Sequence, residues 1–256
     1  MKSLENRVAL VTGSSSGIGQ AIAEKLAHQG ANIVINYVGH REGAEETLKQ
    51  VETDGAQGVI VNADISKLAD VQALIDHGWE AFGSVDILVN NAGMEKKADF
   101  CDVTEEDYDR VLGVNLKGPF FLAQAFVRRL RSAKKTGRII NISSVHEDMA
   151  FPGFSSYCVS KGGMRMLMRD LAVELGPEGF TINNVAPGAI ATPINKSLLD
   201  DKPKLNALLG KIPLGRLGST DDVANLVAFL ASDAAAYITG STFIVDGGLS
   251  RNYREQ

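Results

Sequence analysis

The sequence lacks the features of membrane and secreted proteins. No run of eighteen apolar residues occurs, so we expect no membrane-spanning helix and no membrane partner. The first ten residues have neither the apolar core nor the cleavage site of a signal peptide. The only cysteines, Cys101 and Cys158, form no spacing pattern, and we interpret them as reduced thiols of a cytoplasmic protein. We assign no metal site.

A strong excess of either charge is also missing. The formal net charge is -5 with mixed signs, and no basic stripe suggests a nucleic-acid partner. The one dense basic run, from Arg128 to Lys135, comes late in a predicted helix, where positive charge suits the helix dipole. Small molecules are therefore the expected partners. With 256 residues, 45% of them apolar, the chain suits one α/β domain over residues 1–256.

Apolar strand-like runs alternate with helical patterns along the whole chain. This alternation predicts a doubly wound parallel sheet of about seven strands with helices on both faces. The runs have few polar positions, as expected of strands buried on both sides. The predicted strands are Val8–Thr12, Ala31–Tyr37, Gly58–Asn62, Val85–Asn90, Gly137–Ile142, Thr181–Val185 and Thr242–Val245, and the predicted helices are Ile18–Gln29, Gly43–Asp54, Lys67–Phe82, Thr104–Ser132, Ser155–Gly176 and Thr220–Ala231.

The least regular long stretch runs from residue 187 to residue 218. It contains several prolines and glycines and one short helical patch at Lys204–Leu209. Because it follows a strand at the edge where open α/β sheets bind ligands, we interpret it as a loop that covers substrate. A solvated insertion is the alternative.

A glycine-rich turn follows the first predicted strand and opens the first helix. Glycines let the backbone turn tightly and approach a pyrophosphate, and the helix N-terminus offers free N–H groups. The position in the first βαβ unit supports dinucleotide binding over a structural turn. The candidate residues are Gly13, Ser15, Ser16, Gly17, Ile18 and Gly19.

The ends of the next strands supply further candidates for the cofactor. An NAD-specific protein usually has an acidic residue after the second strand, whereas Tyr37 and Val38 stand here. Nothing repels a 2′-phosphate, and Arg41 is near enough to bind one, so we predict that NADP is accepted, alone or beside NAD. Asp64 and Ile65 are expected at the adenine. The small residues Asn91, Ala92 and Gly93 are expected to lie against the cofactor.

Proton transfer is assigned to a tyrosine and a lysine four residues apart. Tyr157 and Lys161 share one face of a helix. A neighbouring ammonium and an oxidised nicotinamide favour phenolate, so we expect a lowered Tyr157 pKa and a role as general acid and base. Ser144, thirteen residues earlier, is placed to bind the substrate oxygen. Asn115 is a polar residue in the middle of a predicted helix.

Taken together, these residues resemble the short-chain dehydrogenase/reductase family over nearly the whole chain. The resemblance implies a Rossmann-type fold and a homotetramer. It also implies that Tyr157 is the acid/base, that Lys161 binds the nicotinamide ribose, that Ser144 positions the substrate oxygen and that Asn115 anchors a water. The resemblance rests on Thr12 to Gly19, Asn91 to Gly93, Asn115, Ser144, Tyr157 to Lys161, Pro187, Gly188 and Val245 to Gly248, and it implies cofactor contacts from Pro187, Gly188, Ile190 and Thr192.

Within that family, the stretches Ser143–Glu147 and Pro187–Asn195 resemble bacterial glucose 1-dehydrogenases. This implies oxidation of an aldose, such as β-D-glucose, at C1 to the lactone. Glu95 and His146 are candidate partners for sugar hydroxyls. The alternative is that His146 and Glu147 decorate a surface loop. The departures are Val38, where a basic residue is usual, Cys158, where alanine is more usual, and a C-terminus, Leu249–Gln256, that differs in detail.

Two other functions share these residues. A 3-oxoacyl-acyl-carrier-protein reductase, or another ketone reductase of the family, has the same catalytic set. A non-catalytic cofactor-binding protein is the second alternative, and the presence of Ser144, Tyr157 and Lys161 argues against it. A sugar-nucleotide epimerase usually needs a longer chain.

Overall fold

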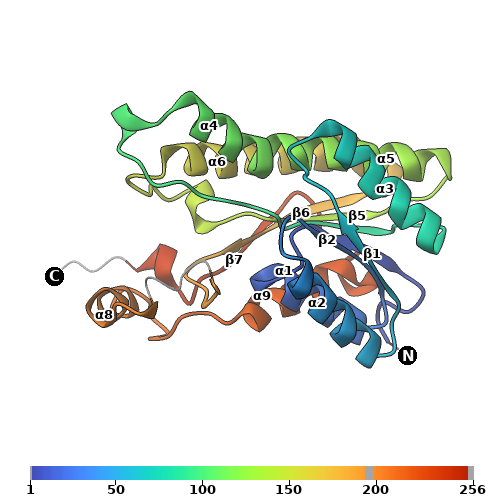
Figure 1. Ribbon diagram of the computed structural model, residues 1–256, viewed down its shortest axis with the longest axis horizontal. Coiled ribbons are helices and arrows are strands. Elements are labelled where there is room, and N and C mark those ends of the chain that lie inside the picture. Colours follow the sequence, from blue (N-terminus) through green and yellow to red (C-terminus); the bar gives the residue numbers. More distant parts are fainter. Residues whose placement is uncertain (1, 194–198, 253–256) are drawn as a thin grey trace.

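A computed structural model describes residues 2–193 and 199–252. These residues include seven parallel strands that form one sheet (Figure 1). The strand order is β3-β2-β1-β4-β5-β6-β7, so the direction of winding reverses between β1 and β4. The doubly wound sheet predicted from the sequence is thus confirmed. The strands are β1 (Val8–Val11), β2 (Asn32–Tyr37), β3 (Gly58–Asn62), β4 (Ile87–Asn90), β5 (Arg138–Ile142), β6 (Thr181–Pro187) and β7 (Thr242–Val245).

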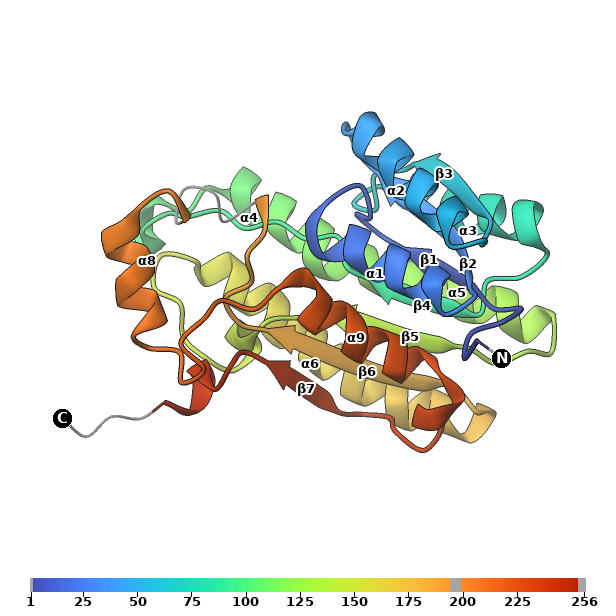
Figure 2. The same cartoon turned by 90° about the horizontal axis from the view of Figure 1, so that it is seen from below.

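Helices cover both faces of the sheet in two layers (Figures 1 and 2). Helices α1, α2 and α9 lie on one face, and α3, α4, α5 and α6 lie on the other. The helices are α1 (Gly17–His28), α2 (Arg41–Thr53), α3 (Leu68–Phe82), α4 (Glu105–Leu112), α5 (Gly118–Ser132), α6 (Ser155–Leu175), α8 (Lys202–Leu209) and α9 (Thr220–Ala231), with short 3-10 turns at Phe100–Asp102, Val145–Glu147, Gly176–Glu178, Asp233–Ala235 and Leu249–Arg251. No helix in the described ranges is long and apolar enough to cross a membrane.

Alternate side chains of the strands pack into two apolar cores. Along β5, Ile139 belongs to the core beneath α5 and α6, whereas Ile140 and Ile142 belong to the core beneath α1 and α9. All four residues of β1 are buried. Burial on both sides explains why the strands have few polar positions. It also leaves the strand ends as the places where polar side chains gather.

The structure corrects the prediction of a single helix over Thr104–Ser132. The structure divides it into α4, a π-helical segment at Gly113–Lys117, and α5. Gly118 donates its N–H to the carbonyl of Gly113, which closes the wider turn. Asn115 therefore lies in a π turn rather than in regular helix, and such turns are often found at functional sites.

The stretch from 187 to 218 is tied down at both ends. Pro187 closes β6, which is two residues longer than predicted because Gly188 still bonds to the carbonyl of Val245. A bridge pairs Ile190 with Gly218. Between them, α8 lies beyond the carboxyl ends of β6 and β7 (Figure 2). The predicted motif residues Ile194 and Asn195 lie outside the described residues, as does the C-terminal segment 253–256.

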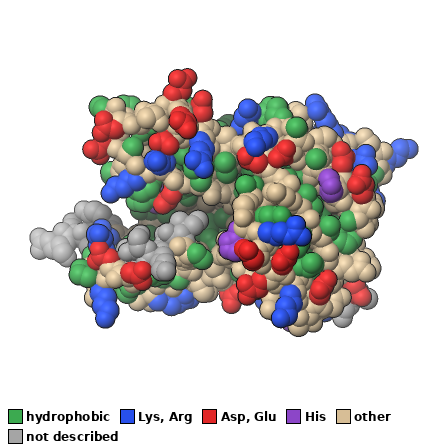
Figure 3. Space-filling model, viewed as in Figure 1, with side chains coloured by type: hydrophobic (Ala, Val, Ile, Leu, Met, Phe, Trp, Pro, Cys, Tyr) green, Lys and Arg blue, Asp and Glu red, His purple; other side chains and the backbone are tan. Residues whose placement is uncertain are grey.

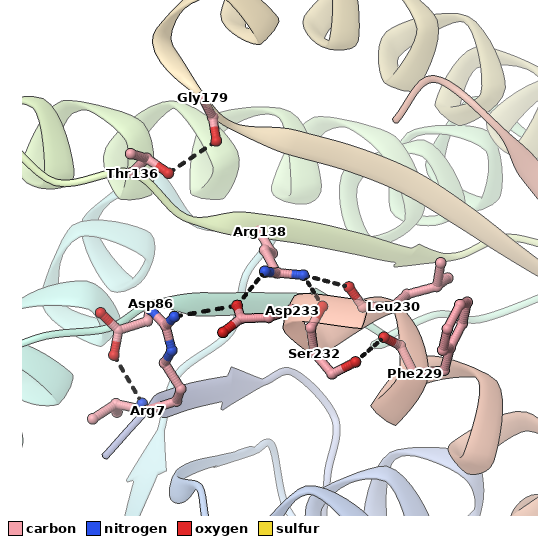
Figure 4. Close-up of polar contacts among 10 residues, drawn as sticks. Arg7, Asp86, Thr136, Arg138, Gly179, Phe229, Leu230, Ser232 and Asp233 are labelled. Atoms are coloured by element: carbon pink, nitrogen blue, oxygen red, sulfur yellow. Dashed lines mark hydrogen bonds and ion pairs between the residues drawn. The ribbon is translucent and has the colours of Figure 1, made fainter. Parts of the chain in front are cut away.

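The opposite, amino-terminal edge of the sheet carries an ion cluster (Figure 4). Arg138 bonds to the carbonyl of Ser232 and to Asp233, at 2.7 Å, and Arg7 also meets Asp233. A cavity of about 120 Å³ lies beside them. The arginines are already partnered by a carboxylate and by helix carbonyls, so we interpret the cluster as a clamp between α9 and the sheet.

Candidate active site

The predicted site residues meet at the carboxyl edge of the sheet. The order reverses between β1 and β4, and a crevice at that switch point is where doubly wound sheets bind ligands. The glycine turn follows β1, Asn91 follows β4, and Ser144 follows β5. One edge therefore collects side chains from distant parts of the chain.

The glycine turn has the backbone that a phosphate cradle requires. Gly13 and Gly17 have φ angles of +62° and +58°, which favour glycine. A Cβ on Gly19 would overlap the Gly13 carbonyl and the Asn91 amide. Ser16 is the exposed N-cap of α1, and its side chain makes no capping bond within the described chain. The free N–H groups of α1 and this hydroxyl are suited to a pyrophosphate.

Two residues that the sequence analysis missed hold the turn in place. Asn36 accepts a hydrogen bond from the Gly13 N–H at 3.2 Å and donates to the Ala63 carbonyl at 2.9 Å. Thr12 accepts from the N–H groups of Asn91 and Ala92 at 2.9 and 3.0 Å. The Asn91 amide in turn donates to the Thr12 carbonyl. The Asn91 side chain and N–H therefore tie β4 to the turn, which leaves mainly its backbone carbonyl for a ligand.

The candidates for the adenosine end are mostly engaged with the protein. Arg41 is exposed and pairs with Glu45 at 2.8 Å, while Tyr37 is buried at the end of β2. Although burial acts against it, hydrogen bonds from Ser66 hold the pKa of Asp64 below its usual value. Ile65 is 4% exposed and packs in the core, so little of its side chain is open to a ligand.

Lys161 is a buried amine at the centre of the site. Its side chain projects from α6, and Nζ donates to the Ile142 carbonyl at 2.8 Å. Nζ also lies 5.6 Å from the centroid of the Tyr157 ring. Burial lowers the pKa of Lys161 to about 8, and the negative charge of Glu147 acts in the opposite direction. The amine is thus close to losing its proton under mild conditions.

Tyr157 corrects the expected direction of a pKa shift. Burial raises the pKa of the Tyr157 phenol to about 12; a hydrogen bond with Ser144 lowers it, and the charge of Glu95 raises it. From the sequence, Lys161 and an oxidised nicotinamide together are expected to lower this pKa. The protein alone does not supply that effect, because desolvation of the phenol outweighs the neighbouring groups.

Asn115 joins the π segment to two neighbouring elements. Its Oδ1 accepts from the Met94 N–H at 2.9 Å, and its Nδ2 donates to the Met94 carbonyl and to Ser160 at 2.8 and 3.0 Å. The side chain is fully buried. Both amide hydrogens are therefore committed to the protein.

An aromatic wall stands beside Tyr157. The His146 ring stacks on Phe151 at 4.2 Å between centroids, Phe151 stacks on Phe154 at 4.1 Å, and His146 meets Tyr157 edge-on at 6.3 Å. Burial lowers the pKa of His146, and its Nδ1 lies 3.3 Å from the Met149 carbonyl. A neutral ring that donates through Nδ1 leaves Nε2 as an acceptor.

Glu95 is near enough for its charge to act on the phenol. It is exposed, yet partial desolvation raises its pKa. Its influence on the Tyr157 pKa brings it to the same site as His146. Glu147, by contrast, has a side chain that is only 4% exposed, so the alternative that it decorates a surface loop is wrong.

The loop from Pro187 brings the remaining candidates next to the glycine turn. A Cβ on Gly17 would lie 3.9 Å from the Thr192 side chain. Pro187 and Ile190 are buried, and Gly188 approaches Asp246 closely. Figure 3 shows a hollow between the α4–α6 layer and the region of α8, with hydrophobic side chains inside it.

Comparisons with known proteins agree with this geometry. Residues 13–250 match a family model described as enoyl-(acyl carrier protein) reductase. The chain is 42% identical to 3β-hydroxysteroid dehydrogenase 1 of Eggerthella lenta, with 96% of this chain and 95% of that protein covered. It is 39% identical to glucose 1-dehydrogenase 2 of Bacillus subtilis, with 97% and 96% covered. A gluconate 5-dehydrogenase structure from Burkholderia cenocepacia, in complex with NADP and tartrate, has a TM-score of 0.91 at 36% identity, with 98% and 97% covered.

Proposed function

The chain belongs to the short-chain dehydrogenase/reductase family, and from that premise we propose that it oxidises an aldose, such as β-D-glucose, at C1 to the lactone. It is an oxidoreductase that uses NAD(P). The feature that carries the proposal is the pairing of Tyr157 and Lys161 at the switch-point edge, with Ser144 bonded to the phenol.

Tyr157 is the group that exchanges the proton. In oxidation it removes the proton of the C1 hydroxyl, and in reduction it returns a proton to the carbonyl oxygen. When bound, the oxidised nicotinamide accepts the hydride and adds positive charge near the phenol. Ser144 holds the substrate oxygen through its hydroxyl as charge develops there. Since the pKa of Tyr157 is raised to about 12, we expect the oxidation rate to climb with pH through the neutral range.

The cofactor is held by the residues of the turn and the strand ends. Gly13 and Gly17 shape the turn through their positive φ angles, and α1, which begins at Gly17 after its N-cap Ser16, presents its first N–H groups to the pyrophosphate. Lys161 reaches toward Gly93, where a Cβ would lie 3.8 Å from Nζ, and this is the expected place of the nicotinamide ribose. We expect Pro187, Gly188, Ile190 and Thr192 to line the carboxamide side. Arg41 is assigned to a 2′-phosphate.

The sugar is recognised by Glu95 and His146. The His146 ring contacts Tyr157 and the charge of Glu95 acts on it, and a carboxylate with a neutral imidazole offers acceptors for adjacent hydroxyls. The flat rings of Phe151 and Phe154 suit the C–H face of a pyranose. The similarity to a Bacillus subtilis glucose 1-dehydrogenase supports this choice of substrate. The loop at 187–218 is assigned as its cover.

A reductase of 3-oxoacyl thioesters is the second candidate. The matching family model carries an acyl-carrier-protein name, and the apolar hollow in Figure 3 would also hold an acyl chain. The alternative uses the same Tyr157 and Lys161. In this alternative, Glu95 would not need to bind a hydroxyl of the substrate.

A homotetramer is part of the proposal. Large apolar side chains stand exposed on α5 and α6, namely Phe120, Val159, Met166 and Val173, at 43% to 80% exposure. Such a patch on neighbouring helices is typical of an interface between copies of a chain. Light scattering after size exclusion tests it against the monomer mass of 27.3 kDa.

A substrate panel tests the function most directly. Purified protein is offered glucose, other aldoses, polyols and acetoacetyl thioesters with NAD and NADP in turn, and the absorbance of reduced nicotinamide is followed. We expect the aldoses to give the largest kcat/KM, with NADP within a hundredfold of NAD. Strong thioester reduction beside background activity on every sugar would overturn the substrate proposal. A larger NADP deficit would overturn the cofactor proposal.

A further inference from the structure

Three asparagines cross the sheet in one row and end on a buried carboxylate. Asn90 on β4, Asn141 on β5 and Asn184 on β6 are aligned by the strand register, and none is more than 3% exposed. Asn90 donates to Asn141 at 2.9 Å, Asn141 donates to Asn184 at 2.9 Å, and Asn184 donates to Oε2 of Glu147 at 3.1 Å. Every amide in the row therefore points its N–H toward Glu147.

The carboxylate sets the direction of the whole row. An ionised carboxylate only accepts hydrogen bonds, so Asn184 must turn its NH₂ group to Glu147 and its oxygen to Asn141. The same requirement then passes to Asn141 and Asn90. Within the described chain, Oδ1 of Asn90 is left buried without a partner at the far end. If Glu147 were protonated, it could donate to Asn184, and the row would not require this orientation of the three amides.

Other donors converge on Glu147 and hold it in place. Thr242, the next residue of the same row on β7, donates its hydroxyl to Oε1 at 2.7 Å. Nε of Arg165 lies 3.6 Å from Oε1. The side chain is 4% exposed. The buried carboxylate thus has two hydrogen-bond donors, Asn184 and Thr242, and one neighbouring cation, Arg165. Burying a charge is costly unless it is paired and hydrogen-bonded in this way.

Lys161 is a buried amine one helical turn before Arg165, the α6 residue that pairs with Glu147. Burial lowers the pKa of Lys161, and Glu147 is the carboxylate whose charge raises it. Three uncharged groups also lie around the amine, namely the Ile142 carbonyl, the Tyr157 phenol and the Asn115 amide. The remaining titratable groups nearby are Arg165 and Asp148 beside Glu147, and Glu95, His146 and Cys158 beside Tyr157.

We propose that Glu147 is a positioning residue of the active site, a counter-charge fixed by the asparagine row that keeps the Lys161 amine in its ammonium form. The role of that ammonium in catalysis rests on the proposed function. The counter-charge itself does not, because it is a property of the protein without substrate. Glu147 thus acts through Lys161 and not on the substrate.

Titration of Lys161 tests the proposal without any turnover. Protein labelled with ¹³C at the lysine ε-carbons is titrated by NMR, and the Lys161 resonance is assigned by its loss in Lys161→Arg. Glu147→Gln keeps the shape and removes the charge, so we expect the titration midpoint to fall by about one pH unit. Asp148→Asn is the matched control: this neighbouring carboxylate also pairs with Arg165 but is exposed, and its loss should leave the midpoint unchanged.

A second variant keeps the proposal testable if Glu147→Gln does not fold. Arg165→Met removes the cation that competes with Lys161 for Glu147, and we expect it to raise the Lys161 midpoint. Kinetics add a further readout. With Glu147→Gln, the high-pH loss of kcat should begin about one unit lower, which makes activity at pH 8 about fivefold weaker than in wild type.

The outcomes separate cleanly. A Lys161 midpoint that Glu147→Gln and Arg165→Met leave unmoved, with only the unfolding temperature changed, overturns the proposal and makes the row structural. A protein that oxidises none of the tested substrates refutes the proposed function, while the NMR titration still decides on the counter-charge.

Discussion

Lys161 lies with its Nζ 5.6 Å from the centroid of the Tyr157 ring and directs its hydrogen bond to the carbonyl of Ile142. The amine and the phenol are therefore close enough to interact electrostatically, but the hydrogen bond of the amine goes to Ile142 and not to the phenol. Lys161 is buried and Tyr157 is partly buried, and loss of solvent penalises the charged form of each. It raises the pKa of Tyr157 to about 12 and lowers that of Lys161 to about 8.

The buried amine of Lys161 reduces the stability of the protein near neutral pH. The pKa is about 8 in the fold against an ordinary 10.5, so between these values the unfolded chain binds more protons and stability rises with pH. Below pH 8 the whole penalty is present, about 3 kcal/mol before the bond to Ile142 is counted. We therefore expect Lys161→Met to raise the free energy of unfolding at pH 7 by about 1–2 kcal/mol. This gain should shrink toward pH 10. Urea unfolding at both pH values checks this. A variant less stable than wild type at pH 7 contradicts it.

Removal of the Asn115 amide should destabilise the fold. Asn115→Leu leaves the buried N–H and carbonyl of Met94 and the Ser160 hydroxyl short of a partner. We expect a loss of about 1–3 kcal/mol in the free energy of unfolding. Asn206→Ala, on the exposed surface of α8, is the control and should change it by less than about 0.5 kcal/mol. Equal effects of the two variants would refute the assignment of Asn115 as the link to Met94.

Gly19 has no room for a side chain. A Cβ there would overlap the Gly13 carbonyl and the Asn91 amide, which together shape the phosphate cradle. Gly19→Ala should weaken NADPH binding at least about tenfold, a loss of about 1.4 kcal/mol. Gly176→Ala serves as control, since no described atom lies within 4 Å of its Cβ. Fluorescence titration with NADPH measures both, and unchanged binding by Gly19→Ala would contradict the cradle.

Arg41 is expected to distinguish the two cofactors. It lies at the start of α2 beside Tyr37 and pairs with Glu45. Arg41→Gln should lower kcat/KM for NADP about tenfold, as expected for one charge-assisted contact to phosphate, and leave NAD unchanged. Glu45→Gln, which frees the guanidinium, should favour NADP. If Arg41→Gln affected both cofactors equally, the assignment to the 2′-phosphate would be wrong.

The sheet could be predicted because strands that are buried on both faces appear in the sequence as continuous apolar runs. The apolar runs of β3 and β7 were predicted with the bounds that the structure has. The end of β6 was missed because Pro187 and Gly188 are typical of a turn, whereas the backbone of Val245 keeps the pairing going.

The parts of the site that depend on tertiary contacts were not predictable. A π turn at Gly113–Lys117 has the same residue types as a regular helix, and only the Gly113 and Gly118 pair hinted at it. The pKa of Tyr157 depends on burial, which spacing does not reveal. The sequence left the surface-loop alternative for Glu147 open, because its partners Asn184 and Thr242 are brought to it by strand register. An asparagine near the carboxyl ends of three different strands was the available signal.

Tyr157→Phe tests the central claim most directly. We propose that the phenol exchanges the proton, and the edge-on contact of its ring with His146 does not need the hydroxyl. We expect kcat to fall about 10²- to 10⁴-fold in both directions, while NADPH binding by fluorescence and the unfolding temperature stay close to wild type. A variant that keeps wild-type turnover would contradict the account, and the site would then be a nucleotide-binding crevice whose chemistry lies elsewhere.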